Sequence, residues 1–281
     1  MTRVAADPSS TRRKRGEGPS RRGDDARLDK RNAPPAIRIL DSELFEIAGV
    51  RFRWVSSDYD KWRTSAEEVI VLKPATWFEY YAGIIRERGV RHLVELGIFE
   101  GGSAIALALL FDELRIAAFD LRQPDPPVLD LLDRLAIADR VKLFYGVYQD
   151  DRKVVGQAVA DVFGGTPIDM VIDDASHQYA PTRASFEMLF PLLRYAGVYI
   201  VEDWAWAHWP GTFQTEQWID QPAMSNLIFE LTMLTGSGHV PIEKIDIRTS
   251  TAAVYKSAAG PLPNFRLDGA FPMRGKPLPL I

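Results

Sequence analysis

The sequence contains no cysteine among its 281 residues. Disulfide bonds, thiolate metal sites and cysteine nucleophiles are therefore excluded, and a reducing cytoplasm is the expected compartment. The sequence also lacks an apolar run near the roughly 20 residues that a membrane-spanning helix needs. The longest candidate covers only residues 104–111, and no apolar stretch follows the basic N-terminus as a secretory signal would require. We expect a soluble chain without a membrane partner.

Charge is distributed unevenly along the chain. The net charge is −4, but residues 1–38 carry 11 Lys and Arg against 5 Asp and Glu, so the remainder is strongly acidic. An acidic body argues against a nucleic-acid partner, because such a partner requires a basic face. Residues 1–35 are poor in large apolar side chains and are predicted to form a disordered basic tail. The basic cluster at residues 12–15 is either simply solvated or an address for an anionic surface.

The region from residue 76 onward alternates between helix and strand patterns. Strands that alternate with helices predict an α/β fold with a Rossmann-like, seven-stranded, mostly parallel sheet and helices on both faces. The predicted helices cover residues 76–88, 101–111, 128–136, 152–163, 182–195 and 223–234. The predicted strands cover residues 92–95, 116–120, 141–145, 168–173 and 198–202, followed by an antiparallel pair at 242–248 and 252–256.

Two further segments flank this Rossmann-like domain of residues 76–258. Residues 36–75 form a predicted N-terminal extension, with strand-like alternation at 37–40 and 50–55. Residues 259–281 are rich in proline and glycine and are predicted to form an extended arm, with Phe265 and Phe271 as anchors. Both segments are candidate contacts in a homo-oligomer.

A glycine-rich turn follows the first strand of the domain, where residues 94–103 read Val-Glu-Leu-Gly-Ile-Phe-Glu-Gly-Gly-Ser. Gly97 permits a tight turn, and Gly101 with the glycine after it lets a ligand approach the backbone. Free N–H groups at the helix start offer donors to a carboxylate, and Glu95 is placed to receive a ligand ammonium. Phe99 stands where a dinucleotide-binding turn requires glycine, which favours a cofactor that presents only an amino-acid end. A purely structural turn is the alternative.

Polar residues also follow the next two strands. Asp120 ends the second strand, 19 residues after Gly101, a spacing at which a carboxylate accepts both hydroxyls of a ribose. A surface aspartate at a strand end is the alternative. Gln149 follows the third strand, where it is placed to approach an adenine.

Two pairs of carboxylates end the fourth and fifth strands, Asp173-Asp174 and Glu202-Asp203. Neighbouring parallel strands bring such ends to one mouth, where like charges repel and each ionised group loses solvation. A hard divalent cation such as Mg²⁺ relieves both effects, since it prefers oxygen ligands. Adjacent residues on a strand point to opposite sides, so only one of Asp173 and Asp174 is expected to face the ion easily. Helix capping by one or two of these acids is the alternative.

These features resemble the class I S-adenosylmethionine-dependent methyltransferases over residues 76–257. The resemblance rests on the E-L-G-x-x-x-G-G-S turn, the acidic end of the second strand and the terminal strand pair. It implies that the methionine end of the cofactor contacts Glu95, Gly97 and Gly101 and that its ribose contacts Asp120. The cofactor-binding set that we predict is completed by Ser103, Gln149 and Asp173.

The segment from Asp174 to His177, followed by Glu202-Asp203, resembles the metal-dependent O-methyltransferases. Catechol O-methyltransferase and the macrolide sugar O-methyltransferases show similar patterns, as do cephalosporin-hydroxylase-type proteins. The resemblance implies that Asp174, Glu202 and Asp203 bind Mg²⁺ or another divalent cation and that His177 is the general base. Coordination lowers the pKa of an acceptor hydroxyl, and a histidine with an ordinary pKa of about 6.5 can take its proton. The predicted reaction methylates a hydroxyl of a small molecule of sugar or natural-product type.

Three tryptophans, Trp204, Trp206 and Trp209, follow directly after these acids. They either stack on an acceptor ring and exclude water, or pack at a subunit interface or against the body of the protein. Two other functions are compatible with the sequence. One is a cephalosporin-hydroxylase-like oxygenase or auxiliary protein on the same metal site. The other is a non-catalytic module whose basic tail binds nucleic acid or membrane, which the acidic body disfavours.

Overall fold

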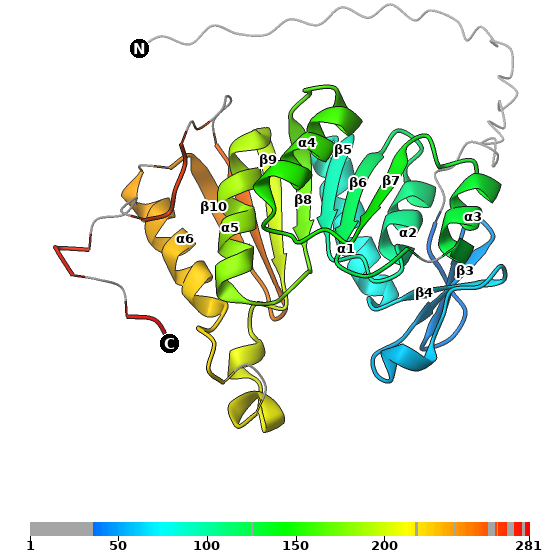
Figure 1. The fold of residues 1–281 in the computed structure, drawn as a ribbon, viewed down its shortest axis with the longest axis horizontal. Coiled ribbons are helices and arrows are strands. Elements are labelled where there is room, and N and C mark those ends of the chain that lie inside the picture. The colour runs from blue at the N-terminus through cyan, green and yellow to red at the C-terminus, as the bar shows by residue number, and fades with distance from the viewer. Residues whose placement is uncertain are drawn as a thin grey trace, which may run out of the picture. The chain divides into compact units, whose positions relative to one another are not determined.

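A computed structural model of the chain describes residues 36–124, 126–216, 219–238, 240–257, 262, 264–268, 273–276 and 279–281. The predicted basic tail of residues 1–35 and the predicted anchor Phe271 lie outside these residues. The described part contains one sheet of four strands and one of seven, with helices packed around the larger sheet (Figure 1).

The seven-stranded sheet has the strand order β10-β11-β9-β8-β5-β6-β7. The five strands from β7 to β9 pair in parallel, whereas β11 pairs antiparallel with both β9 and β10. The predicted α/β fold with a mostly parallel sheet and a terminal antiparallel pair is therefore confirmed. The strands are β5 (His92–Leu96), β6 (Arg115–Asp120), β7 (Val141–Tyr145), β8 (Ile168–Asp173), β9 (Leu193–Glu202), β10 (Ile242–Ile247) and β11 (Thr251–Lys256).

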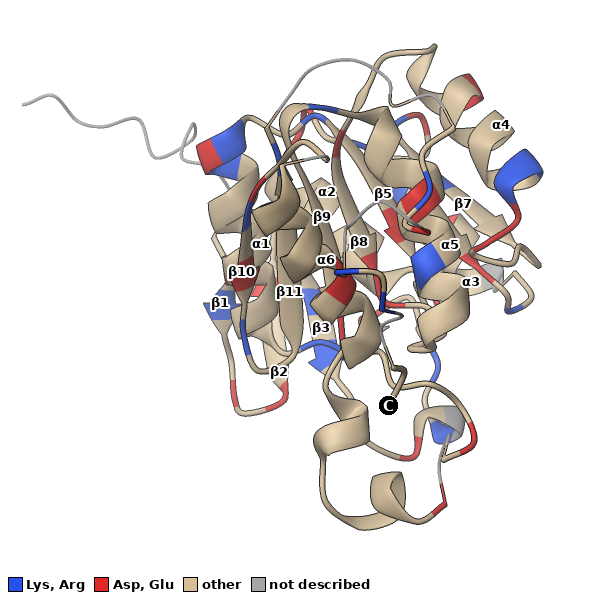
Figure 2. Cartoon of the chain, turned by 90° about the vertical axis from the view of Figure 1, so that its left-hand side faces the viewer, with Lys and Arg blue, Asp and Glu red and all other residues tan. Residues whose placement is uncertain are grey.

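Helices cover both faces of this sheet, as Figure 2 shows for α1 and α5 on opposite sides of β8 and β9. Because side chains alternate along a strand, Leu93 and Ile172 join the core on one face, while Val94 and Val171 join the core on the other. The first face packs against α1 (Ala75–Arg88), α2 (Gly102–Leu110) and α3 (Pro126–Arg134). The second packs against α4 (Arg152–Phe163), α5 (Tyr179–Leu189) and α6 (Ser225–Ser237).

Capping residues explain why some helix ends could be predicted from the sequence. Helix α1 ends at Gly89, which adopts a left-handed φ of 61° and donates its N–H to Ile85. Helix α4 begins after Asp151, whose carboxylate accepts the N–H groups of Lys153 and Val154.

One predicted helix and one predicted strand are wrong where they meet. The helix predicted over residues 182–195 ends at Leu189, and β9 begins at Leu193 rather than at residue 198. Pro191 offers no N–H to a continuing helix, so apolar residues that fit a helical period enter the sheet instead. A left-handed Ala196 with a φ of 58° then lets the strand continue through an irregular register beside β8.

The N-terminal segment forms a four-stranded sheet of its own, in the order β1-β2-β3-β4. Its aromatic core joins that of the domain, since Phe45 stacks on Phe52 and also contacts Phe78 of α1. Alternation in the sequence predicted the first and third strands but not the second and fourth. In Figure 1, β3 and β4 lie at the lower edge of the main sheet, as does the loop that follows β9. The strands are β1 (Arg38–Ile39), β2 (Leu44–Ile47), β3 (Val50–Trp54) and β4 (Glu68–Val71).

The described part of the C-terminal arm packs on the α5 side of the sheet. Phe265 lies against Phe186 and Phe190, with ring centroids 6.3 Å and 6.1 Å apart, and Leu267 is fully buried. Among the helices of the described residues, none has the length and apolar character to cross a membrane.

Candidate functional site

A cavity of about 520 Å³ lies at the carboxyl ends of β5, β6, β8 and β9. The glycine turn, the carboxylate cluster and the N-terminal sheet all contribute to its lining. Of the residues predicted for the site, the cavity is lined by Gly97, Ser103, Asp120, Asp174, His177, Glu202 and Asp203.

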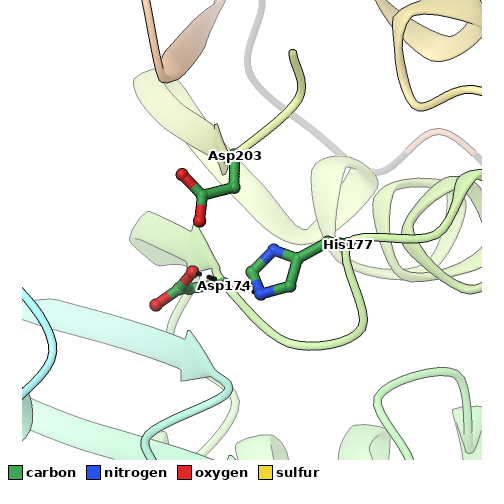
Figure 3. A group of neighbouring side chains, drawn as sticks. All are labelled: Asp174, His177 and Asp203. Carbon is green, nitrogen blue, oxygen red and sulfur yellow. Dashed lines mark ion pairs between the residues drawn. The ribbon is translucent and has the colours of Figure 1, made fainter. Parts of the chain in front are cut away.

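Asp174 and His177, from the loop after β8, and Asp203, which follows β9, point toward one another (Figure 3). One potential ligand atom from each lies within 4.8 Å of the other two, a spacing at which a single metal ion fits between them. The Nε2 atom of His177 lies 3.8 Å from Oδ1 of Asp174. Two carboxylates and an imidazole are suitable ligands for a divalent cation.

The backbone holds two of these three residues in an unusual conformation. His177 and Asp203 have φ values of 53° and 51°, in the left-handed region that costs a non-glycine residue about 1 kcal/mol or more. A hydrogen bond of 2.7 Å from the N–H of Asp203 to Ser250 fixes the second of them. Strained residues concentrate at functional sites, because packing around the site maintains a geometry that the chain alone would not adopt.

His177 carries a largely buried imidazole beside Asp174. Burial lowers its pKa, an effect that the neighbouring Asp174 opposes. Its ring lies on that of Trp206, with centroids 4.2 Å apart, and its buried Nδ1 has no hydrogen-bond partner in the described residues. A neutral imidazole with a free nitrogen can accept a proton.

Asp203 is a largely buried carboxylate with a raised pKa. Burial and the nearby Asp174 raise its pKa to about 7, while Lys73 and Trp206 lower it. A bound cation would favour the ionised form further, since an opposite charge at short range stabilises a carboxylate.

Glu202 occupies a different position from the other acids. It is almost fully buried on the α1 side of the sheet, where its Oε2 accepts a hydrogen bond of 2.9 Å from Lys73 and its Oε1 accepts one from the hydroxyl of Tyr81. Burial and Asp174 raise the pKa of Glu202, whereas Lys73 and Tyr81 lower it. Because both oxygens already receive donors, Glu202 is paired within the protein; its predicted role as a metal ligand stays a prediction.

Lys73 is a site residue that the sequence reasoning missed. It follows β4 of the N-terminal sheet, and its ammonium also donates to Oδ2 of Asp174. Burial opposes its charge, but Asp174 and Glu202 outweigh that effect and raise its pKa. The available signal was a lone lysine directly after the apolar run of residues 69–72, a context in which a charge needs a partner.

Glu95 is a buried carboxylate beside the glycine turn. Burial raises its pKa to about 7, with Lys73 and Ser103 opposing the rise. Neither of its oxygens has a hydrogen-bond partner of good geometry in the described residues. A buried acceptor without a donor is costly, so this position suits a donor from a ligand.

The glycines of the turn are required mainly by the protein's own packing. A Cβ at Gly97, whose φ is 79°, would lie 2.1 Å from the backbone oxygen of Asp174. A Cβ at Gly102 would lie 2.2 Å from the oxygen of Ile70, so α2 starts in contact with β4. Gly101 has a φ of 95° and faces the side chain of Leu143. Gly102 also lines the cavity, so the expectation that Gly101 and Gly102 let a ligand approach the backbone stays a prediction.

Asp120 organises the turn from the end of β6. Its Oδ2 accepts the N–H groups of Ile98 and Phe99 at 2.9 Å and 2.7 Å, and its Oδ1 accepts that of Arg122 at 2.8 Å. A carboxylate can accept about four hydrogen bonds, which leaves capacity for a ligand hydroxyl in the cavity that Asp120 lines.

Gln149 and Asp173 lie away from the cavity, on the α5 side of the sheet. The amide of Gln149 donates to Asp173 and to Ser185, and the hydroxyl of Tyr199 donates to Asp173 at 2.5 Å. The Gln149 oxygen accepts the N–H of Ser176, so this network anchors the loop that carries His177. Neither residue lines the cavity in this structure, and side-chain alternation at the end of β8 is the reason.

The three tryptophans that follow β9 have two different roles. Trp206 and Trp209 line the cavity, as do Trp54 of β3 and Trp77 of α1. Trp204 does not line it; its indole N–H donates to the backbone oxygen of Arg248 and pins the loop to the sheet. Four tryptophans therefore line the cavity that also holds the carboxylate cluster.

Comparison with known proteins identifies the central part of this fold. Residues 94–204 match a family model described as a methyltransferase domain. L-olivosyl-oleandolide 3-O-methyltransferase of Streptomyces antibioticus is 39% identical over 83 residues, and mycinamicin VI 2''-O-methyltransferase of Micromonospora griseorubida is 39% identical over 84 residues. Each alignment covers 30% of this chain, but only 21% and 20% of these relatives. The chain therefore matches about a fifth of their length.

A solved structure extends the likeness to the fold. MycE methyltransferase from the mycinamycin biosynthetic pathway, in complex with Mg, SAH and mycinamycin VI, has 25% identity and a TM-score of 0.50. The superposition covers 67% of this chain and 52% of MycE. The chain has the class I methyltransferase fold, and the resemblance to S-adenosylmethionine-dependent O-methyltransferases is confirmed.

Proposed function

We propose that this chain, whose residues 94–204 match a methyltransferase domain, is an S-adenosylmethionine- and divalent-metal-dependent O-methyltransferase that acts on a sugar or natural-product hydroxyl. The observation that carries the proposal is the convergence of Asp174, His177 and Asp203 beside the glycine turn. The names of the relatives support the acceptor class, because two of them are O-methyltransferases of glycosylated macrolide intermediates.

The glycine-turn wall suits the amino-acid end and ribose of the methyl donor. Glu95 has buried, unpartnered oxygens that fit an ammonium, and Asp120 retains capacity for a ribose hydroxyl. Gly97, Gly101 and Ser103 shape the turn between them. When bound, the cofactor supplies an electrophilic sulfonium methyl group. Gln149 and Asp173 would act indirectly, by anchoring the loop of His177.

The carboxylate wall suits a divalent cation such as Mg²⁺. Asp174 and Asp203 would hold it with oxygen ligands, close to the imidazole of His177. Such a cation lowers the pKa of a coordinated hydroxyl. Glu202 would contribute to the charge of the site from its position beside Lys73.

His177 would remove the proton of the acceptor hydroxyl. Its ring packs against that of Trp206, with centroids 4.2 Å apart, and its backbone has a left-handed φ of 53°. General bases of this kind typically contribute about 10²–10⁴-fold to a rate. Trp206 and Trp209, together with Trp54 and Trp77, would supply apolar surfaces for the acceptor and exclude water.

The test is transfer of a radiolabelled methyl group from S-adenosylmethionine to a panel of glycosides bearing free sugar hydroxyls. We expect transfer in the presence of Mg²⁺, loss of transfer in excess chelator and recovery when Mg²⁺ is restored. Transfer that persists undiminished in chelator would refute the metal role. Failure of calorimetry to detect S-adenosylmethionine binding would refute the methyltransferase function, and would favour the oxygenase-like alternative on the same fold.

A further inference from the structure

We propose that Glu100 is a positioning residue for the acceptor. Its carboxylate ties the loop between β3 and β4, residues 55–67, to the glycine turn, and so holds the cavity-lining part of that loop in place. This inference rests on the proposed function, because it concerns the acceptor of that reaction. Glu100 does not itself line the cavity, so it acts through the loop rather than on the acceptor.

The β3–β4 loop forms part of the cavity. Val55, Ser56 and Tyr59 of this loop line the cavity, and they follow Trp54 at the end of β3. Tyr59 is 47% exposed, so its ring is accessible to an incoming molecule. A half-exposed tyrosine offers an apolar ring and a polar tip, a combination that suits a molecule with both apolar and hydroxyl groups. The position of the loop therefore affects how the acceptor is held.

The middle of the loop is bonded to itself. The hydroxyl of Tyr59 donates to the backbone oxygen of Ser56 at 3.2 Å, and Lys61 forms an ion pair of 2.9 Å with Asp58. Both contacts are local and exposed, and exposed ion pairs contribute little to stability. These bonds shape the loop but do not fix it against the rest of the domain.

Glu100 connects the end of this loop to the domain. It is only 3% exposed, and its Oε2 accepts the N–H of Thr64 at 2.7 Å. The Nε of Arg63 lies 3.8 Å from Oε1 of the same carboxylate. Thr64 is also buried, and its hydroxyl accepts the N–H of Ile70 in β4 at 3.1 Å. Hydrogen bonds to a charged acceptor are among the stronger ones, so this carboxylate links the loop and β4 to the glycine turn.

The glycine turn gives Glu100 a fixed backbone from which to act. Asp120 accepts the N–H groups of Ile98 and Phe99 at 2.9 Å and 2.7 Å. The N–H of Gly101 donates to the backbone oxygen of Ile98 at 2.7 Å. None of these bonds uses the side chain of Glu100. Changing that side chain should therefore release the loop and leave the turn intact.

The experiment compares the full chain with the variants Glu100→Ala, Glu100→Gln and Asp41→Ala. Asp41 is the matched control, because it lies in the same N-terminal part and accepts two backbone N–H groups at 2.8 Å, but does not line the cavity. Hydrogen exchange of the cofactor-free protein, followed by mass spectrometry, measures the loop. Peptides that cover the loop should exchange at least about tenfold faster in Glu100→Ala, and within about threefold of the wild type in the other two variants. In Glu100→Gln the amide oxygen can still accept the N–H of Thr64.

Steady-state methyl transfer to a glycoside that the wild type accepts measures the consequence for the acceptor. Glu100→Ala should raise the KM for the glycoside at least about fivefold, with kcat and the calorimetric affinity for S-adenosylmethionine within about threefold of the wild type. Glu100→Gln should restore the KM. A merely structural loss would instead reduce the amount of active protein, and hence kcat at an unchanged KM.

The outcomes separate the possibilities. Unchanged loop exchange in Glu100→Ala overturns the inference, and so does faster exchange at an unchanged KM. A KM that rises equally in Asp41→Ala also overturns it, because any weakening of the N-terminal sheet would then have the same effect. If the wild type itself methylates no glycoside, the proposed acceptor class fails and the inference fails with it.

A second variant keeps the test decisive should Glu100→Ala not fold. Glu100→Asp retains the charge but shortens the side chain by one methylene group, which withdraws the carboxylate from Thr64. It should show the same rise in KM at unchanged affinity for S-adenosylmethionine. An unchanged KM in Glu100→Asp, with loop exchange faster than in the wild type, overturns the inference.

Discussion

Replacing Gly97 with alanine tests whether the glycine turn and the carboxylate cluster are one mechanical unit. The added Cβ would lie 2.1 Å from the oxygen of Asp174, 2.5 Å from its carbonyl carbon and 2.6 Å from Cα of Ala175. All three are backbone atoms, so no side-chain rotation relieves the overlap. The end of β8 must move away from the end of β5.

The cost follows from three effects at this position. Alanine at a φ of 79° pays roughly 1–2 kcal/mol for the left-handed conformation. Overpacking against backbone adds about 1–3 kcal/mol. Displacing β8 also endangers the 2.8 Å hydrogen bond from the N–H of Asp174 to Leu96, worth about 1 kcal/mol. We expect Gly97→Ala to lower the free energy of unfolding by about 3–6 kcal/mol, a large part of the 5–15 kcal/mol of a typical domain.

Urea unfolding of the variant, with a matched control, measures this effect. Gly156 lies in the interior of α4, and a Cβ there meets nothing within 4 Å. Gly156→Ala should therefore stabilise the protein by about 0.5–1 kcal/mol. Because Asp174 belongs to the displaced segment, Gly97→Ala should also weaken Mn²⁺ binding, whereas Gly156→Ala should not. A Gly97→Ala protein as stable as the wild type would refute the reasoning.

Three further predictions concern individual groups of the site. Burial raises the pKa of Glu95 to about 7, above the 4.5 of an exposed glutamate, so the folded protein retains a proton that the unfolded chain loses over that range. The contribution of Glu95 to the free energy of unfolding therefore becomes more unfavourable as pH rises from about 4.5 to 7. Across that interval, urea titrations of the cofactor-free Glu95→Gln variant should show its stability rising by up to about 3 kcal/mol relative to the wild type. A stability difference that does not change with pH would contradict this. His177→Ala should lower turnover at least about 100-fold while leaving the calorimetric affinity for S-adenosylmethionine unchanged, and equal losses would argue against a general base. Trp206→Ala should raise the KM for the acceptor, whereas Trp204→Ala, which lies outside the cavity, should not; parallel effects in steady-state assays would mean that the loop acts as a whole.

Side-chain alternation at the strand ends predicts part of the candidate site but not all of it. Alternation along β8 correctly separates Asp174, which lines the cavity, from Asp173, which bonds to Tyr199 on the other face. At the end of β9, by contrast, both Glu202 and Asp203 line the cavity. The strand pattern alone does not decide which of these two faces the candidate metal position, because the left-handed turn at Asp203 redirects the chain there.

The amino-acid sequence determined the parallel sheet, the glycine turn and the meeting of Asp174 with Asp203. These features depend on apolar periodicity, which is read from neighbouring residues, and on the rule that parallel strands end at one edge of a sheet, which follows from the topology. The same information placed His177 three residues after Asp174.

Only the tertiary structure decided what surrounds those acids. Lys73 lies 101 residues before Asp174 and belongs to a separate sheet, so no spacing in the sequence links them. The start of β9 depended likewise on its pairing with β8 rather than on its helix-like sequence. Burial and Coulomb interactions depend on distances between segments, and these distances exist only once both sheets have packed against α1 and α2.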